Sequence, residues 1–179
     1  MKNKFRKLSK ISLTLIYLVI VAGAIVRMTG SGMGCPDWPK CFGYYIPPTE
    51  SKQLLFKANN YYEKGMMILL EHQEFLVAKK DFTSTDSFDA NDWKVYSKHN
   101  YVTYDPIHTW VEYVNRLIGV LSGIPILIFS ILSFWFWKKN KWIPIVSILT
   151  LFGMGCQAWL GKTVVDSNLT PYKITIHMV

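Results

Sequence analysis

The chain has 179 residues, of which 50% are hydrophobic, 15% aromatic and only 18% charged, and this composition excludes a disordered tail, a collagen and a charge-rich coiled coil. Its net charge of +8 gathers in two short segments, which argues against a nucleic-acid-binding face and is typical of the cytoplasmic segments of a membrane protein. The basic residues of these segments are Lys2, Lys4, Arg6, Lys7 and Lys10 at the start, and Lys138, Lys139 and Lys141 further along.

The first apolar run predicts a transmembrane span over residues 11–28, preceded by a cytoplasmic basic start over residues 1–10. Its uncharged part is about 24 Å long as a helix, which suffices when Lys10 and Arg27 extend their charged ends to the membrane interfaces. A cleavable signal peptide is the alternative interpretation, because the run follows basic residues and Ala22-Gly23-Ala24 resembles a cleavage site.

Two cysteines lie in the outer segment that we predict for residues 29–106. Cys35 and Cys41 enclose the five residues Pro-Asp-Trp-Pro-Lys, and the oxidising environment outside a cytoplasmic membrane permits a disulfide between them. A redox-active pair and free thiols are the alternatives, since the spacing alone does not choose. A zinc knuckle is disfavoured, because its cysteines are closer together and further ligands should lie nearby.

The rest of the outer segment is soluble in character. Apolar residues between Lys52 and Lys80 predict an amphipathic helix or a pair of helices. The stretch from Asp81 to Asp92 is rich in Ser, Thr and Asp and predicts a loop. His72 and His99 each stand alone in this segment, and we interpret both as solvated.

The clearest apolar run predicts a second span over residues 107–137. Leu117 to Trp137 contains no charge and is about 32 Å long as a helix, enough to cross a bilayer. The run ends in four aromatic residues before the lysine cluster, which is the arrangement expected at a membrane interface.

One face of this helix is predicted to be polar. Helical spacing aligns five residues on that face, and one more borders it; they are His108, Glu112, Asn115, Gly119 and Gly123, bordered by Arg116. Ionisable residues at the edge of a span usually face a bundle interior or a water-filled cavity, so we interpret this face as a ligand pocket that glycine keeps open. An ordinary helix start, with Glu112 favoured by the helix dipole and Arg116 reaching the interface, is the alternative.

The last part of the chain predicts a third span over residues 142–160, an outer turn over 161–170 and the start of a fourth span over 171–179. So short a fourth segment cannot cross a bilayer, which predicts an N-terminal fragment of a longer protein; an intact three-span chain is the alternative. With both basic segments in the cytoplasm, the second and fourth spans start at the outer face. His177 and Glu112 then lie at similar depth, and imidazole is a common ligand of heme iron.

Three blocks of this sequence resemble heme A synthases. The block from Gly23 to Cys41 resembles the end of the first span and the first outer loop of that family. The block Glu112-Tyr-Val-Asn-Arg-Leu-Ile-Gly119 resembles its Glu-x-x-His-Arg segment. The third span, outer turn and fourth span are matched by Gln157-Ala-Trp-Leu-Gly161, Leu169-Thr-Pro-Tyr and His177. The resemblance covers about residues 15–43 and 107–179.

The resemblance implies an all-α integral membrane fold, in which this chain is the N-terminal four-helix bundle half of an eight-span protein, truncated in the fourth span. It implies an oxidoreductase that converts the heme O methyl group to the formyl group of heme A for cytochrome oxidase biogenesis, with a heme b in the other half. A b-type cytochrome and a non-catalytic heme-handling or assembly protein are the alternatives.

The implied surroundings and partners follow from the same resemblance. The protein should be a multi-pass protein of the cell membrane with its N-terminus inside. Its expected partners are the lipid bilayer, heme O, heme O synthase and oxidase assembly factors, with a homo-oligomer as a further option and no nucleic acid.

The resemblance also implies roles for individual residues. Glu112 is the expected catalytic residue, and His177 the expected ligand of the heme iron. Asn115 stands where the family usually has a histidine ligand, so either His177 binds the iron alone or His108 serves in a shifted position. Arg116 and Gly119 complete the expected heme-binding face, and Cys35 and Cys41 correspond to the family's loop cysteines.

Overall fold

The computed structural model describes residues 2–70, 74–99, 103–167 and 169–178, and it forms two compact units. The helical unit comprises Met1–Thr29 and Val114–Val179, and the sheet unit comprises Gly30–Tyr113. One helix runs through both: its first turns belong to the sheet unit, and the remainder belongs to the helical unit.

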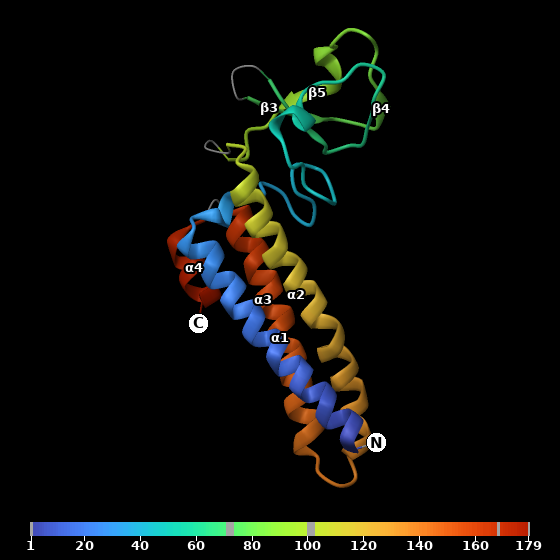
Figure 1. Ribbon diagram of the computed structural model, residues 1–179, viewed down its shortest axis with the longest axis vertical. Coiled ribbons are helices and arrows are strands. Elements are labelled where there is room, and N and C mark those ends of the chain that lie inside the picture. Colours follow the sequence, from blue (N-terminus) through green and yellow to red (C-terminus); the bar gives the residue numbers. More distant parts are fainter. Residues whose placement is uncertain (1, 71–73, 100–102, 168, 179) are drawn as a thin grey trace. The chain divides into compact units, whose positions relative to one another are not determined.

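The helical unit is built from α1 (Lys2–Met28), α2 (Pro106–Ser133), α3 (Trp142–Asp166) and α4 (Pro171–Met178), as Figure 1 shows. A short 3-10 helix, η4 (Phe134–Phe136), follows α2. Three helical stretches within the described residues are long and apolar enough to cross a membrane, namely Asn3–Met28, Pro106–Phe136 and Trp142–Asp166. The predicted class of helical, multi-pass membrane protein is therefore confirmed. Helix α3 continues past residue 160, where the third span was predicted to end.

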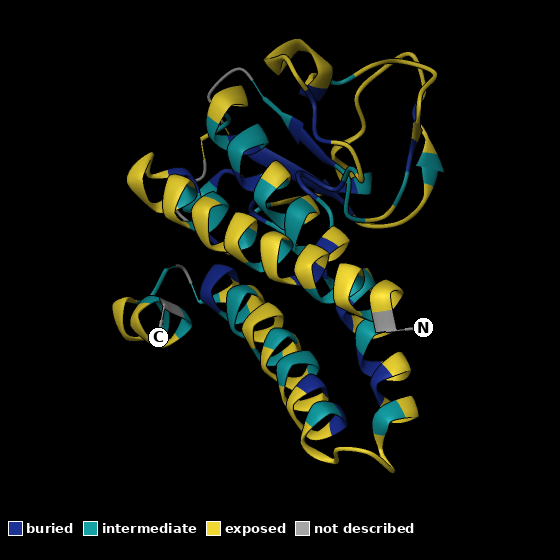
Figure 2. Ribbon diagram, turned by 60° about the horizontal axis from the view of Figure 1, so that its bottom comes forward, coloured by how far each residue is buried: buried dark blue, intermediate teal, exposed yellow. Residues whose placement is uncertain are grey.

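Much of the surface of these helices is exposed, as Figure 2 shows, and many of the exposed side chains are apolar. Tyr17 on α1, Val120 on α2 and Phe152 on α3 each expose more than 60% of their area. Exposing such apolar side chains to water costs free energy, whereas contact with lipid tails does not.

A buried cluster of serines joins α2 to α3 within the helical unit. Ser130 Oγ donates to the Ser147 carbonyl oxygen at 2.9 Å, and Ser147 Oγ lies 2.6 Å from Ser133 Oγ. All three hydroxyls are buried. Small hydroxyl side chains let two membrane helices approach closely and bond to each other, so this cluster fixes the α2–α3 hairpin.

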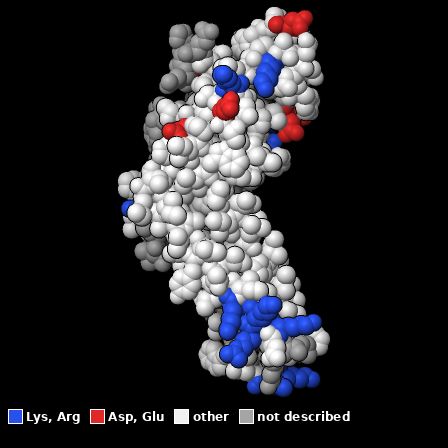
Figure 3. Space-filling view, in the orientation of Figure 1, with Lys and Arg blue, Asp and Glu red and all other residues white. Residues whose placement is uncertain are grey.

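Both basic segments lie at the same end of the helical unit (Figure 3). The Phe5 ring near the start of α1 is 4.7 Å from the Phe129 ring of α2 and 4.7 Å from the Phe136 ring of η4. This packing holds the basic start of α1 beside the lysines that precede α3, as the charge pattern predicted.

The sheet unit contains two small antiparallel sheets. Strand β1 (Tyr61–Tyr62) pairs with β4 (Phe82–Thr83). In the second sheet, β3 (Phe75–Ala78) lies between β2 (Met67–Leu69) and β5 (Trp93–Val95). The register pairs Ile68 with Leu76 and Leu76 with Val95. Short 3-10 helices complete the unit: η1 (Ser31–Met33), η2 (Ser51–Leu54) and η3 (Ala90–Asp92).

The predicted helix between Lys52 and Lys80 is wrong. Among the described residues of this range, only η2 is helical, and Met67–Leu69 and Phe75–Ala78 form β2 and β3. Both faces of β3 are buried, so its residues are apolar without interruption instead of alternating with polar ones. Such a run cannot be told from a buried helix by periodicity. The predicted loop from Asp81 to Asp92 is largely irregular, with β4 and η3 inside it.

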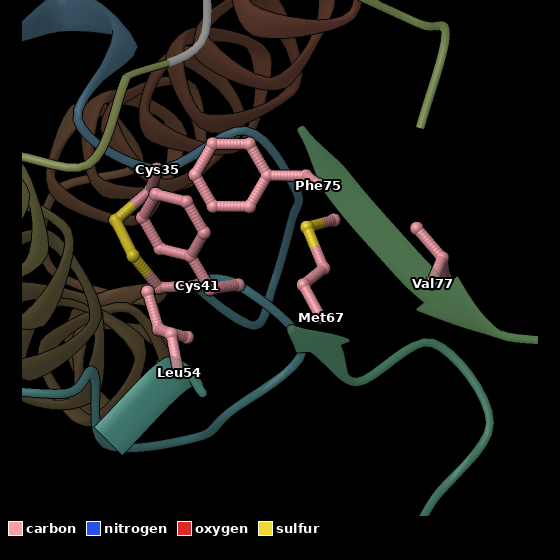
Figure 4. Close-up of a cluster of buried hydrophobic side chains, with 7 residues drawn as sticks. Cys35, Cys41, Leu54, Met67, Phe75 and Val77 are labelled. Atoms are coloured by element: carbon pink, nitrogen blue, oxygen red, sulfur yellow. A yellow bond between two sulfur atoms is a disulfide. The ribbon is translucent and has the colours of Figure 1, made fainter. Parts of the chain in front are cut away.

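Two apolar clusters cover the two faces of the three-stranded sheet. The first contains the two loop cysteines and residues from β2 and β3 (Figure 4): Cys35, Cys41, Phe42, Leu54, Met67, Phe75 and Val77. The second contains the alternate residues of the same strands and aromatic residues beyond them: Tyr62, Ile68, Leu76, Ala78 and Trp93. Successive strand residues point to opposite faces, so one short sheet serves two cores.

The sequence analysis interpreted two histidines of this unit, His72 and His99, as solvated. His99 is buried, with 4% of its area exposed, and its ring lies 5.9 Å from that of Tyr96. The expectation that His99 is solvated is therefore wrong. His72 lies outside the described residues.

Candidate functional site

The loop cysteines form a disulfide within the sheet unit. Cys35 and Cys41 are bonded to each other, and both are almost completely buried. The bond packs against Phe42 and Leu54 in the first apolar cluster (Figure 4). The structure thus contains the bonded form among the alternatives that the spacing left open.

Asp37, inside the disulfide loop, holds the backbone that leaves it. Its two carboxylate oxygens accept hydrogen bonds from the N–H groups of Phe42 at 2.6 Å and Gly43 at 2.8 Å. Phe42 and Gly43 both have positive φ angles, 55° and 80°, a conformation that leaves consecutive N–H groups without strand or helix partners. Asp37 therefore stabilises a tight turn. Sequence reasoning did not single it out, although an aspartate shortly before a glycine is a turn signal.

Glu112 is tied directly to the disulfide loop. Its carboxylate oxygen Oε2 accepts a hydrogen bond of 2.9 Å from the Cys35 N–H, and only 4% of its area is exposed. Both residues belong to the sheet unit. A buried carboxylate needs such partners, so the loop fixes the position of the predicted catalytic residue.

His108 and Thr109 on the first turns of α2 also bond to the loop. His108 Nδ1 lies 2.9 Å from Ser31 Oγ, and Thr109 Oγ1 donates to the Gly34 carbonyl oxygen at 2.9 Å. Ser31 and Thr109 are completely buried. The structure therefore brings His108 and Glu112 together with the cysteine loop, and the contact of His108 with Ser31 is partly buried.

Gly34 permits this close approach of the loop to α2. A Cβ atom at this position would lie only 2.3 Å from the His108 carbonyl oxygen and 2.8 Å from the Thr109 nitrogen. These are backbone atoms of a helix and cannot move aside cheaply. Only glycine fits without separating the loop from the helix.

We expect Gly34→Ala to destabilise the sheet unit by about 1–3 kcal/mol, the usual cost of overpacking. The loop must move away from α2, and this movement also lengthens the hydrogen bond from the Cys35 N–H to the Glu112 carboxylate. Thermal unfolding of the full-length protein in detergent measures this as a lower midpoint. Gly23→Ala on α1 is the matched control, because nothing lies within 4 Å of its Cβ position. Equal midpoints for the two variants would contradict the close-packing argument.

Three further predicted site residues lie on α2 within the helical unit. Asn115, Arg116 and Gly119 are half-buried. Apart from the neighbouring residues and the nearby backbone of α2 itself, no described atom lies within 4 Å of the Cβ positions of Gly119 and Gly123. The two glycines, one turn apart, therefore leave open surface on α2. This is the flat face on which the sequence predicted a ligand.

His177 on α4 is held by α3 within the helical unit. Its Nδ1 lies 2.9 Å from Gln157 Oε1. Its ring also lies against Gly161, whose Cβ position is 3.5 Å from both Cε1 and Nε2 of the ring. Among the described residues, Nε2 has no hydrogen-bond partner, so this nitrogen is available to a metal. An imidazole with one nitrogen bonded and the other available fits an axial ligand of heme iron.

Three ionisable groups of the sheet unit, Lys40, Tyr44 and Tyr104, have raised pKa values. A 2.7 Å hydrogen bond to Glu63 raises the pKa of Lys40, and burial raises the pKa of Tyr44 and Tyr104. Raised pKa values keep the lysine cationic and the tyrosines neutral at physiological pH. These groups shape the loop and do not titrate near neutrality.

The chain matches a known protein family over nearly its whole length. Two overlapping segments, residues 6–78 and 64–179, match the family described as cytochrome oxidase assembly protein. The matched segments include residues 44–106, to which the sequence blocks assigned no counterpart. No solved structure matches the chain.

Several relatives of this chain are named heme A synthase. A heme A synthase of Shewanella oneidensis is 24% identical over 172 residues, 96% of this chain and 40% of that protein. Heme A synthases of Flavobacterium psychrophilum and Orientia tsutsugamushi are 26% and 27% identical, covering 92% and 90% of this chain but 43% and 38% of their own lengths. The chain thus spans about 40% of the length of these relatives.

Proposed function

The chain belongs to the cytochrome oxidase assembly protein family, and from that premise we propose that it takes part in heme A synthesis. Its substrate is heme O, whose methyl group is oxidised to the formyl group of heme A for cytochrome oxidase biogenesis. The observation that carries this proposal is the match of at least 90% of the chain to three heme A synthases. The arrangement around His177 supports it independently.

His177 binds the heme iron through Nε2 in this proposal. Gln157 occupies the other ring nitrogen at 2.9 Å, which leaves Nε2 for the metal. Asn115 supplies no second strong ligand, because an amide is a poor partner for iron. A heme held by His177 would supply the oxygen chemistry of the reaction.

Arg116 and the glycines of α2 receive the rest of the heme. A guanidinium pairs well with a carboxylate, and we assign Arg116 to a heme propionate. Gly119 and Gly123 present backbone without side chains, and the open space at both positions suits the approach of a flat ring system.

Glu112 is the acid–base residue of the proposed reaction. Conversion of a methyl to a formyl group removes two hydrogen atoms from the carbon and adds one oxygen atom, a four-electron oxidation that requires an external oxidant. A carboxylate would contribute by accepting a proton or by stabilising developing positive charge. The bond from the Cys35 N–H fixes its carboxylate. Fixed geometry is what catalysis requires of such a group. His108, bonded to Ser31, is assigned to holding the loop.

The proposed function is tested in cells that make heme O but lack heme A. The full-length protein containing this chain should lead to heme A in the membrane fraction. Absence of heme A, with the protein present in the membrane and heme O available, would overturn the proposal.

We further propose that the protein lies in the cell membrane with its N-terminus inside. Positive segments stay in the cytoplasm, so Asn140→Cys in the turn before α3 should be protected from an impermeant thiol reagent added outside. Ser87→Cys in the sheet unit should react, because Ser87 is exposed. Cys156, the free cysteine, is replaced by alanine in both variants. The reverse labelling pattern would contradict this orientation.

A further inference from the structure

Gln157 and Gly161 contact the His177 ring from one face of α3. They are four residues apart, so they lie one above the other on the helix. Gln157 Oε1 lies 2.9 Å from Nδ1, and the Gly161 Cβ position lies 3.5 Å from Cε1 and Nε2. Nδ1 is therefore hydrogen-bonded, and Cε1 and Nε2 lie at van der Waals distance from the Gly161 Cβ position.

The chemistry of the amide oxygen selects one form of the imidazole. A carbonyl oxygen only accepts hydrogen bonds, so Nδ1 must carry the proton that it donates to Gln157 Oε1. The lone pair of a neutral ring then resides on Nε2. The bond crosses from α4 to α3, and a polar pair on apolar membrane helices has few competing partners.

We propose that Gln157 is a positioning residue for His177: it fixes the Nδ1–H form, orients the ring and increases the electron donation of Nε2 to the iron. The inference rests on the proposed function in one respect only, namely that His177 binds heme iron. When the nitrogen that does not bind the metal donates a hydrogen bond, the imidazole becomes a more basic ligand. A more basic ligand stabilises ferric over ferrous iron. Gln157 thereby sets both the geometry and the reduction potential of the site.

Gly161 has a steric part in the same arrangement. A distance of 3.5 Å is ordinary van der Waals contact, so Gly161→Ala should be accommodated. A larger side chain at this position would push the ring away from Gln157.

The first test needs no heme. In heme-free full-length protein, the nitrogen NMR shifts of isotope-labelled His177 should show the Nδ1–H form. Gln157→Leu, which keeps the size but removes the acceptor, should shift the ring towards the Nε2–H form. Gln157→Glu, which keeps an acceptor in place, should retain the Nδ1–H form. Thr150→Val on α3 is the control, because the Thr150 hydroxyl donates to the Val146 carbonyl oxygen of its own helix and to no other described residue. An unchanged ring signal in Gln157→Leu would overturn the inference.

The second test uses the heme-loaded, full-length protein. Gln157→Leu should raise the reduction potential and lower the iron–histidine stretching frequency in resonance Raman spectra of the ferrous form. Gln157→Glu, a stronger acceptor, should move both quantities in the opposite directions. If Gln157 had a purely structural role, both variants would lower the heme content, and the reduction potential and stretching frequency would not shift in opposite directions in the two variants.

The two proposals fail in different ways. If His177→Ala removes the heme but both Gln157 variants keep the wild-type potential and frequency, only the role of Gln157 is wrong. If His177→Ala keeps the heme unchanged, the assignment of His177 as ligand in the proposed function is wrong, whatever the NMR shifts show.

Discussion

Replacing His177 with alanine should remove heme O and heme A from the full-length protein. We assign one strong iron ligand to this chain, Nε2 of His177. The position at which the family resemblance implies a second histidine ligand is occupied by Asn115. Loss of a sole axial ligand leaves only contacts to the ring edge and the propionates, which hold a heme weakly. Heme content per protein, measured by extraction and chromatography, should fall below detection for these two hemes.

His108→Ala is the matched control for that experiment. His108 is bonded to Ser31 of the cysteine loop, so its loss should loosen the loop and leave the heme spectrum nearly unchanged. A heme spectrum that changes equally in both variants would instead identify His108 as a second ligand. Unchanged heme content and activity in His177→Ala would contradict the assignment of His177.

Glu112→Gln should retain heme and lose most heme A formation, by about 100-fold or more. Glutamine keeps the size of the side chain and an oxygen that can accept the bond from the Cys35 N–H. It cannot take up a proton as a carboxylate does. The ratio of heme A to heme O extracted from the membranes measures the effect.

Glu74→Gln is the matched control, because Glu74 is an exposed residue of the sheet unit. It should form heme A at the wild-type level. Wild-type heme A formation in Glu112→Gln would show that Glu112 serves only to anchor the loop. A variant that also lost its heme would point to a structural role.

The sequence predicted the membrane helices and brought the disulfide into consideration because their signals are local. A long uncharged run between basic segments can bury its apolar side chains only in a bilayer, and α1, α2 and α3 have the necessary length and composition. Cys35 and Cys41 are close enough in sequence for their pairing to be considered directly. Their bond was one of several alternatives until the structure supplied it.

The sheet unit could not be predicted in the same way. Its strands have two to four residues, and β3 is buried on both faces, so periodicity carries no signal. The pairing of β3 with β5 joins Ala78 to Trp93 across a long connection, which is a tertiary contact. His99 is buried for the same reason, since its surroundings come from the folded unit.

The site shows the same division between local and distant information. Helical spacing placed Glu112, Asn115 and Gly119 on one face of a single helix. The bond from Cys35 to Glu112 joins residues 77 positions apart, and the bond from Gln157 to His177 joins two helices. Gln157 lay within a block that resembles heme A synthases, but only the folded α3–α4 pair gives it a partner.

The mass of the heme extracted from purified, full-length protein tests the central claim most directly. We predict heme A together with heme O, because the protein binds the substrate and oxidises its methyl group to a formyl group. Heme B alone would contradict this account and indicate a cytochrome that carries electrons. A preparation without heme would contradict it as well, and would indicate an assembly protein without a catalytic role.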